Sequence, residues 1–472
     1  MYRFSFRDAL RQYRWKELGL FIIPFIILLL EMTQLLLARL VHSGGLNATA
    51  SLSTKNLPTI EGLIPVLGLI AVLFAINILL SIFFPKADQI LLPLVGLLSG
   101  IGVLMALRIG PNLPPPTTDP SLGTRQLVWV MLGFVAFLIT IFGLRSMDWL
   151  RRNYWLWAIL GIAMVGITLT RSLRANLNSP THDQLNIGPL NLQPSELLKI
   201  FLVIFFAAYL SRNIESVAEG GIRVGPFRLP PLNKLGPILL MLGLALLLFL
   251  GIRELGLALL IYGIFLVMIY LGTGNVWYVI GSLVVFVALA LVGYKLFGYV
   301  RLRFAAVPFD VVNWQNWTQA QEQFATGDGL QLVQGIIALS SGGIIGAGLG
   351  LGHPTFVPVV QSDMIFTALG EELGLAGLFA ILGIYLFIIY RGFRIAIEAT
   401  DTFNQLLAAG LTSIFAIQTL IIAAGNMKLL PLTGIPLPFL SYGGSSIIAN
   451  YIIIGILLRI SHNTARERQG LA

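Results

Sequence analysis

The sequence predicts an all-α polytopic membrane protein with about 12 transmembrane helices, and three observations support this. Of the 472 residues, 57% are hydrophobic and only 11% are charged, whereas soluble domains carry about 25% charged residues. Apolar runs of about 18 or more residues recur along the chain, and each is long enough to cross a bilayer. The 49 glycines and 23 prolines lie in apolar sequence that lacks the alternating pattern of an outer-membrane barrel.

The expected spans start after a basic N-terminal segment. The first apolar run, 18–40, is too long for a signal-peptide core and lacks a small-residue cleavage site, so a retained helix is expected. The remaining spans are centred in 62–84, 90–108, 126–144, 155–170, 195–211, 235–251, 254–272, 276–297, 366–390, 403–425 and 445–460. The longest connection, about 297–365, exceeds ordinary loop lengths, and its tryptophans and apolar stretches predict an ordered, functional loop.

The basic residues indicate the orientation of these spans. More than half of the 30 lysines and arginines lie on the side of the N-terminus, although the opposite side has the longest loops. Because cytoplasmic loops carry the excess of basic residues, both termini are predicted to be cytoplasmic and loop 297–365 extracytoplasmic. The basic residues are scattered at span ends instead of clustering on one polar face, so nucleic acid is not expected as a partner despite the net charge of +9.

The cysteine and histidine content of the sequence gives little support for thiol or metal chemistry. The chain has no cysteine, which excludes disulfides and thiolate catalysis. The four histidines show no metal-ligand spacing: His42, His182, His353 and His462. No metal site is therefore predicted from the sequence.

Ionisable side chains inside apolar spans cost about 2.5–3.5 kcal/mol each to insert and are therefore functional candidates. They are Glu31, Glu196, Lys199, Glu254, and a group near the start of one helix, Asp363, Glu371 and Glu372. Glu196 and Lys199 are three residues apart and are predicted to pair on one helical face. The same residues, following Pro194, also fit a plain helix start with an interfacial ion pair and no chemistry, so both interpretations stay open.

The long loop carries one carboxylate close to two cations. Asp310 follows Arg301 and Arg303, and such a carboxylate can act as a general base while the arginines bind an anionic phosphate group. The alternative is a solvated turn aspartate. The repeated glycines in 346–352 resemble a phosphate cradle only superficially, since no strand precedes them, and close helix or loop packing is expected there.

The segment Pro431–Ser446, PLTGIPLPFLSYGGSS, contains prolines and glycines that prevent a regular helix, so we expect it to line a cavity. It resembles the signature of the FtsW/RodA/SpoVE family, the SEDS peptidoglycan glycosyltransferases. Three further stretches are similar to family elements: Gly188–Lys199, Leu330–Gly350 and Gln361–Gly377. The likeness covers about residues 90–460.

This resemblance implies a ten-helix core preceded by two additional helices. Residues 1–85 would form an N-terminal cytoplasmic tail with the two additional helices, and 86–472 the SEDS-like core. The implied function is inverting polymerisation of lipid II, with a lipid pyrophosphate as leaving group, on the outer face of the cytoplasmic membrane. The role is in cell division or elongation, and the implied partner is a class B penicillin-binding protein, a transpeptidase.

The resemblance also implies roles for individual residues. The catalytic base is Asp310; because the loop lacks the family's Asp-Pro pair, Glu322 and Asp328 are the fallback residues. The substrate-binding candidates are Arg301, Arg303, Glu196, Lys199, Gln331, Gln334, Asp363, Ser441 and Gly443. No cofactor is evident, while a divalent cation that binds the pyrophosphate stays open.

Two functions of other classes compete with the glycosyltransferase. A flippase for lipid-linked precursor is motivated by charged residues in the bundle, namely Glu31, Glu196, Lys199 and Glu254. A non-catalytic scaffold of a division or elongation complex is motivated by the departures in the loop. Polymer formation from lipid II by the purified protein separates the first function from the other two.

Overall fold

The computed structural model describes residues 13–42, 60–144, 146–174, 185–187, 190–218, 222–224, 227–229 and 232–470. Its first half contains α2 (Trp15–His42), α3 (Ile60–Phe83), α4 (Leu91–Ile109), η2 (Gly110–Asn112), α5 (Leu122–Gly143), α6 (Asp148–Arg152), α7 (Tyr154–Arg174), β1 (Leu185–Ile187), β2 (Leu190–Leu192), α8 (Pro194–Ala218), β3 (Ile222–Val224) and β4 (Phe227–Leu229). Its second half contains α9 (Leu232–Gly251), α10 (Leu255–Thr273), α11 (Val276–Leu296), α12 (Gly298–Ala305), η3 (Trp314–Asn316), α13 (Gln319–Thr326), α14 (Leu330–Gly342), η4 (Pro354–Phe356), α15 (Ile365–Glu398), α16 (Thr402–Asn426) and α17 (Gly444–Glu467).

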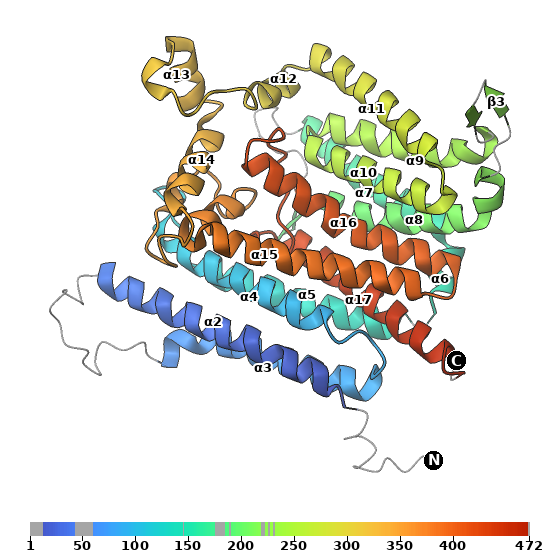
Figure 1. Ribbon diagram of the computed structural model, residues 1–472, viewed down its shortest axis with the longest axis horizontal. Helices are drawn as coiled ribbons and strands as arrows, with labels where there is room; N and C mark the ends of the chain where they lie inside the picture. The colour runs from blue at the N-terminus through green and yellow to red at the C-terminus, as the bar shows by residue number, and fades with distance from the viewer. Residues whose placement is uncertain are drawn as a thin grey trace.

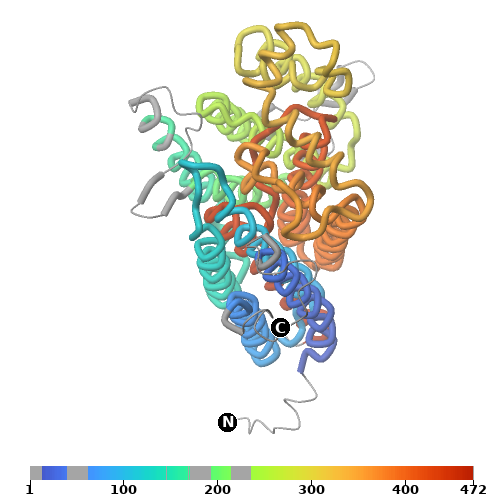
Figure 2. The backbone as a smooth tube through the Cα atoms, turned by 90° about the vertical axis from the view of Figure 1, so that its left-hand side faces the viewer, coloured from blue at the N-terminus to red at the C-terminus, as the bar shows by residue number. Residues whose placement is uncertain are grey.

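The long helices lie side by side in one bundle (Figure 1). α2 begins and α17 ends at the same end of the bundle, called here the N/C end, while α13 and α14 lie at the opposite end, called the loop end. Figure 2 looks along the bundle and shows α2 and α3 at one edge and the segment around α13 at the other. The two hairpins, β1–β2 and β3–β4, are antiparallel and three residues long on each strand.

The predicted all-α membrane fold is confirmed. Among the described residues, ten helices are long and apolar enough to cross a membrane. Two shorter apolar helices, Tyr154–Ile167 and Leu235–Gly251, coincide with further expected spans, and the total of twelve stays a prediction. Individual bounds agree closely with the hydropathy pattern, as for α11 and α16.

Helices α4, α8 and α16 form the centre of the bundle, because most of the residues in their apolar windows are buried, whereas none is buried in α11. Close approach in the centre depends on small residues. A Cβ on Gly102 of α4 would lie 2.7 Å from the carbonyl oxygen of Phe439, so this glycine allows the irregular segment before α17 to rest on α4.

The long loop is ordered around a small core of its own, as the sequence predicted. Buried Phe309, Ala325 and Val333 form this core, and Trp317 and Phe324 pack against it. The ring of Phe309 lies 5.1 Å from that of Trp317 and 5.0 Å from that of Phe324. These contacts give the turn after α12 a fixed position on the loop end.

The glycine-rich stretch after α14 is packed against the start of α15, which confirms the prediction of close packing. A Cβ on Gly346 would lie 2.3 Å from the carbonyl oxygen of Glu372. Glu371 accepts a hydrogen bond from the backbone N–H of His353, and Glu372 forms a buried ion pair with Arg108 at 3.0 Å. The paired glutamates therefore hold this loop in place.

One sequence prediction is wrong about position. Glu254 was expected inside a span, but it is the N-cap residue of α10, in the half-buried turn after α9. The turn reverses the chain at Arg253, whose φ is +63°. Apolar sequence on both sides of the turn concealed this boundary from a hydropathy reading.

Candidate functional site

At the loop end, the segment from α12 to the turn at 310 runs antiparallel to the connector between α16 and α17. Arg303 Nη1 donates a hydrogen bond to the carbonyl oxygen of Leu432 at 3.0 Å. Further along, the Lys428 ammonium donates a hydrogen bond to the carbonyl oxygen of Phe309. These two hydrogen bonds bring the predicted base Asp310, the predicted phosphate-binding Arg303 and the proline-rich segment close together.

Asp310 is exposed and lies between Phe309 and Val311, which belong to the small aromatic core or pack against it. Its carboxylate accepts hydrogen bonds from Asn313 Nδ2 at 2.5 Å, Val312 N at 2.9 Å and Asn313 N at 3.3 Å. Its carbonyl oxygen accepts one from Trp317 Nε1 at 2.7 Å. The Asn313 side chain, the two backbone donors and the Lys428 charge lower the pKa of Asp310, so an accessible carboxylate is ionised at neutral pH.

Asp363 forms a second polar cluster at the start of α15. Its carboxylate accepts hydrogen bonds from Gln331 Nε2 at 3.2 Å and from the Ser362 hydroxyl at 3.0 Å. Burial raises the pKa of Asp363, while these bonds and the Arg303 charge act against the rise. Asn426 donates to the Asp363 carbonyl oxygen at 3.1 Å, which ties the end of α16 to this cluster.

The segment Pro431–Ser446 is irregular up to α17 and is held by hydrogen bonds to the residues before α15. The Ser441 hydroxyl accepts from Leu437 N at 2.7 Å and donates to the Ser362 carbonyl oxygen, and Tyr442 N donates to the Gln361 carbonyl oxygen at 2.8 Å. The segment was expected to line a cavity, but the recess beside it, lined by Asp363, Ile422, Gly425, Asn426 and residues 432–435, is too narrow to admit a water molecule. The hydroxyl of Ser441 is thus used inside the protein.

Glu196 and Lys199 form the predicted pair in the bundle. Lys199 Nζ lies 2.7 Å from Glu196 Oε2, and both side chains are buried. The same ammonium donates to Gln418 Oε1 at 3.2 Å, and Gln418 Nε2 donates to the Pro436 carbonyl oxygen at 2.6 Å. Pro194 starts α8 in the first turn, where its missing N–H costs nothing. The pair is therefore connected through Gln418 to the backbone of the proline-rich segment.

The remaining predicted residues are not all gathered around Asp310. Arg301 is exposed, and within the described part of the chain no hydrogen bond or ion pair joins it or Arg303 to Asp310. Gln334 lies half-buried on α14, one turn after Gln331. Gly443 is the N-cap of α17. The fallback carboxylates are exposed, Glu322 on α13 and Asp328 in the following turn.

The structure adds two residues that the sequence reading missed, Lys428 and Asn313. Both lie next to Asp310, but Lys428 is 119 positions from the residue it contacts. The available signal for Lys428 was a cation at the end of a span, three residues before the proline-rich segment. For metals, the described ranges contain no group of three or more His, Asp or Glu side chains placed to hold an ion.

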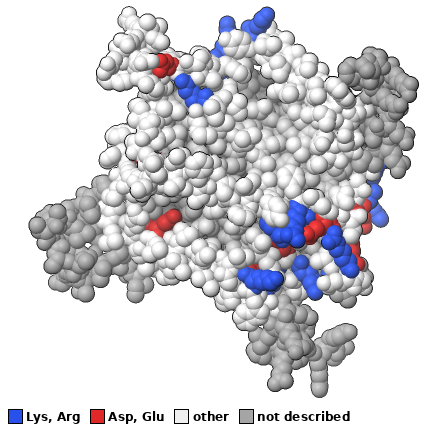
Figure 3. All heavy atoms as spheres, viewed as in Figure 1, with Lys and Arg blue, Asp and Glu red and all other residues white. Residues whose placement is uncertain are grey.

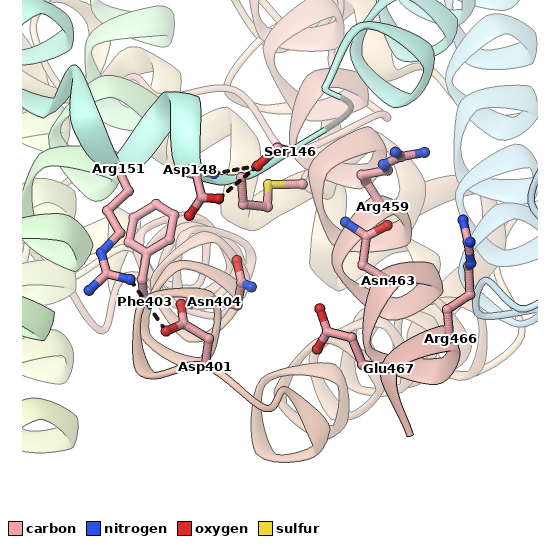
Figure 4. Close-up of a pocket in the computed structure, with 11 residues that line it drawn as sticks. Ser146, Asp148, Arg151, Asp401, Phe403, Asn404, Arg459, Asn463, Arg466 and Glu467 are labelled. Carbon is pink, nitrogen blue, oxygen red and sulfur yellow. Dashed lines mark hydrogen bonds and ion pairs between the residues drawn. The ribbon is translucent and has the colours of Figure 1, made fainter. Parts of the chain in front are cut away.

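A cavity of about 460 Å³ opens at the N/C end, away from this site (Figure 4). Asp401, which caps α16, forms an ion pair with Arg151 at 3.5 Å on one side of it. Its lining contains three carboxylates and three arginines: Asp148, Asp401, Glu467, Arg151, Arg459 and Arg466. The balance of charge gives this cavity no preference for an anion or a cation.

Comparison with known proteins identifies the family. The family model described as cell cycle protein, FtsW/RodA/SpoVE, matches residues 89–466. The chain belongs to this family. This FtsW/RodA/SpoVE protein is 37% identical over 388 residues to the peptidoglycan glycosyltransferase RodA of Mycobacterium tuberculosis, covering 81% of this chain and 80% of the relative. It is 30% identical over 382 residues to the stage V sporulation protein E of Bacillus subtilis, covering 79% and 96%.

Solved structures share the fold of this FtsW/RodA/SpoVE protein. The rod shape determining protein RodA of Thermus thermophilus has a TM-score of 0.54 at 23% identity, over 80% of this chain and 97% of that chain. A chain from a structure described as "structural coordination of polymerization and crosslinking by a peptidoglycan synthase complex" has a TM-score of 0.61 at 21% identity, over 80% and 98%.

Proposed function

We propose that this protein is a peptidoglycan glycosyltransferase that polymerises lipid II into glycan strands. Its relatives carry that activity in their names, and the family match covers most of the chain. Within the site, the observation that carries the proposal is an exposed, ionised carboxylate, Asp310, next to the ammonium of Lys428. A base beside a cation suits a reaction that removes a proton from a sugar hydroxyl and releases a pyrophosphate.

In the proposed mechanism, Asp310 accepts the proton of the acceptor sugar hydroxyl. The hydroxyl oxygen forms a bond to the anomeric carbon of the donor, the bond from that carbon to the pyrophosphate breaks, and the configuration inverts. Val312 N and Asn313 orient the carboxylate through their hydrogen bonds. The carboxylate is ionised before the substrate arrives, so no prior deprotonation is required.

The leaving pyrophosphate needs cations, and Lys428, Arg303 and Arg301 lie on the two segments that meet beside Asp310. Lys428 uses one of its three N–H groups on Phe309 and has two left for phosphate oxygens. Arg303 uses Nη1 on Leu432, which leaves its other donors, and Arg301 is exposed. We assign phosphate binding to these three side chains, with a divalent cation as the alternative that a chelator titration tests.

The proposed orientation places the loop end on the outer face of the cytoplasmic membrane and both termini in the cytoplasm. The distribution of lysine and arginine along the chain supports it. We further propose that 1–85 is an N-terminal addition to a SEDS-like core of 86–472. The start of the family match at residue 89 is consistent with that boundary.

A flippase role finds less support in the bundle. Charged side chains that carry a substrate through a membrane need to face a pathway, but Glu196 and Lys199 are buried and paired with each other, and Lys199 also contacts Gln418. Glu254 lies at the loop end in a turn. We therefore give Glu196 and Lys199 a positioning role, since Gln418 links them to the proline-rich segment.

Purified protein given fluorescent lipid II in detergent tests the proposed activity. We expect a ladder of glycan polymers without any added protein. Addition of a chelator should leave the ladder if the three cationic side chains suffice, and its loss with recovery on Mg²⁺ would establish the divalent cation instead. Absence of polymer under all of these conditions would contradict the glycosyltransferase and favour a scaffold.

A further inference from the structure

A second cavity at the N/C end, of about 560 Å³, lies between the N-terminal helix pair and the family core. Lys16 and Leu20 of α2 and Lys86 of the α3–α4 turn form one wall, and Arg391 of α15 and Arg468 after α17 form another. Three of these, Lys16, Leu20 and Lys86, precede the residues that the family model matches. The cavity therefore depends on the part of the chain that is additional to the core.

The wall that carries Lys86 has a fixed backbone. Buried Arg14 donates hydrogen bonds to the carbonyl oxygens of Phe84 at 3.1 Å, Ala87 at 2.8 Å and Asp88 at 2.5 Å. The guanidinium is held in turn by Glu17, with Arg14 Nε 2.6 Å from the Glu17 carboxylate. This network positions the turn before any ligand binds.

The same turn is attached to the core from the other side. The Asp88 carboxylate accepts hydrogen bonds from Arg391, at 2.9 Å from Nε, and from the backbone N–H groups of Ile90 and Leu91. Asp88 N donates to the Ser461 hydroxyl of α17 at 3.1 Å. Elements α2, α4, α15 and α17 thus meet around one preorganised cavity.

The charges that line this cavity favour an anion. Four cations, Lys16, Lys86, Arg391 and Arg468, face two carboxylates, Asp88 and Glu398. Both carboxylates are engaged, Asp88 with Arg391 and Glu398 with Arg394 at 2.7 Å. Lys16 and Lys86 are exposed, and in the described ranges neither has an ion pair. Figure 3 shows Lys and Arg gathered over the ends of α15 and α17 and the start of α2.

Apolar side chains continue from the cavity along the membrane-spanning helices. Leu20 is followed one turn later by Ile23, which is 66% exposed, on the outer side of α2. On α15, Ile395 and Arg391 line the cavity, and Phe387, one further turn along the same face, is 60% exposed. A ligand with a charged head and apolar chains matches both parts of this surface.

We propose that this cavity binds the headgroup of an anionic phospholipid, whose acyl chains lie against α2 and α15. Basic pockets at the cytoplasmic ends of transmembrane helices are suited to such headgroups. The phosphate contacts Lys16 on the N-terminal pair, Lys86 in the turn that joins the pair to the core, and Arg391 and Arg468 on the core, so the lipid bridges the two parts. The orientation proposed above places this lipid in the cytoplasmic leaflet. Whether the cavity binds the lipid does not depend on the proposed glycosyltransferase reaction.

The test is binding of fluorescent phosphatidylglycerol to the purified, delipidated full-length protein in detergent. We expect saturable binding that is tighter than that of phosphatidylcholine with the same label and chains. The K16Q/K86Q double variant should bind phosphatidylglycerol about 30-fold more weakly, since each cation near an anionic lipid surface contributes about fivefold. Both side chains are exposed and lack an ion pair in the described residues, so the melting temperature of the double variant without lipid should match wild type.

The matched control is R152Q/R466Q, which removes the same charge from exposed positions of the same end that do not line this cavity. It should keep wild-type affinity. Equal affinity for the two lipids, or equal weakening in both double variants, would overturn the proposal. Inorganic phosphate at millimolar concentration is also tested as a competitor of the fluorescent lipid. If it displaces the probe as effectively as unlabelled phosphatidylglycerol does, the cavity is a free-phosphate site, which also overturns the lipid assignment.

Discussion

The Lys428 ammonium donates a hydrogen bond to the carbonyl oxygen of Phe309, the residue directly before Asp310. This contact joins the connector after α16 to the long loop close to the aromatic core of that loop. It places a cation beside the proposed general base and fixes the backbone that carries it. We infer that the two halves of the site, base and phosphate-binding cation, are positioned by one interaction.

Replacing the base should abolish polymerisation without unfolding the protein. Asp310→Asn removes the ionisable group from an exposed position and keeps an acceptor oxygen for the N–H of Val312. General-base catalysis contributes about 10² to 10⁴ in rate, so the lipid II polymerisation rate should fall by that factor at an unchanged melting temperature. Glu322→Gln and Asp328→Asn are the controls. Activity of Asp310→Asn within about threefold of wild type would transfer the role to whichever control variant loses activity.

The pH dependence of the reaction should report the lowered pKa of Asp310. The reactive form is the carboxylate, so kcat/KM is constant above the pKa and falls as the pH drops through it. Because the pKa is below the ordinary value of about 3.9, the acid limb should lie below about pH 4. The measurement is kcat/KM as a function of pH. Circular dichroism at each pH checks that the protein remains folded.

Asn313→Ala provides the matched variant for that profile. The Asn313 side chain contributes most to the lowered pKa and Lys428 least, so Asn313→Ala should move the acid limb further toward higher pH than Lys428→Met. A wild-type limb between pH 6 and 7 would instead assign the base to a different group.

Much of this fold was predictable because hydropathy is a local property. The expected span at 276–297 corresponds to α11, and the one at 403–425 corresponds to α16, within a residue or two. The Glu196–Lys199 pair was also predictable, since both residues lie one turn apart on the same helix. Family resemblance then directed attention to Asp310, which composition and spacing alone left as an ordinary loop residue.

The rest of the site depends on contacts between distant parts of the chain. The pairing of Lys428 with Phe309 and of Arg303 with Leu432 spans more than a hundred residues and leaves no periodic pattern in the sequence. The same holds for Lys86 and Arg468, which share a cavity only after the bundle has assembled. The boundary at Glu254 was concealed because apolar residues flank the turn on both sides.

Glu196 and Lys199 should show strong coupling in a double-mutant cycle. Removing one partner leaves an uncompensated charge in a buried site and should cost about 3–5 kcal/mol, so the double alanine variant should lose less stability than the sum of the two singles. The half-exposed pair Arg394–Glu398 is the control and should couple by about 0.3–0.5 kcal/mol. Thermal unfolding in detergent measures both cycles, and strict additivity for Glu196 and Lys199 would remove the coupling.

The absence of cysteine from the sequence allows a direct test of orientation. Val312, 83% exposed at the loop end, and Gln469, exposed at the N/C end, are replaced singly by cysteine. An impermeant maleimide applied to intact cells should label Val312→Cys and not Gln469→Cys, and permeabilised cells should label both. The opposite pattern would invert the orientation and place the site in the cytoplasm.

The last prediction concerns the partner. A wall that resists turgor needs glycan polymerisation and cross-linking at the same place, but this sequence contains no Ser-x-x-Lys motif of a transpeptidase. We therefore expect mild crosslinking and pull-down from the native cell to recover a class B penicillin-binding protein. Its single transmembrane helix would pack on the bundle.

Adding that transpeptidase should raise the polymerisation rate of the purified protein. The proposed base is held by a small loop core and by Lys428, so a partner that contacts the loop end shifts the population toward the arrangement that binds both substrates. Lys428→Met removes the contact with Phe309 and should reduce basal activity while increasing the relative gain from the partner. Full activity of the lone chain, together with recovery of no transpeptidase, would count against a functional complex.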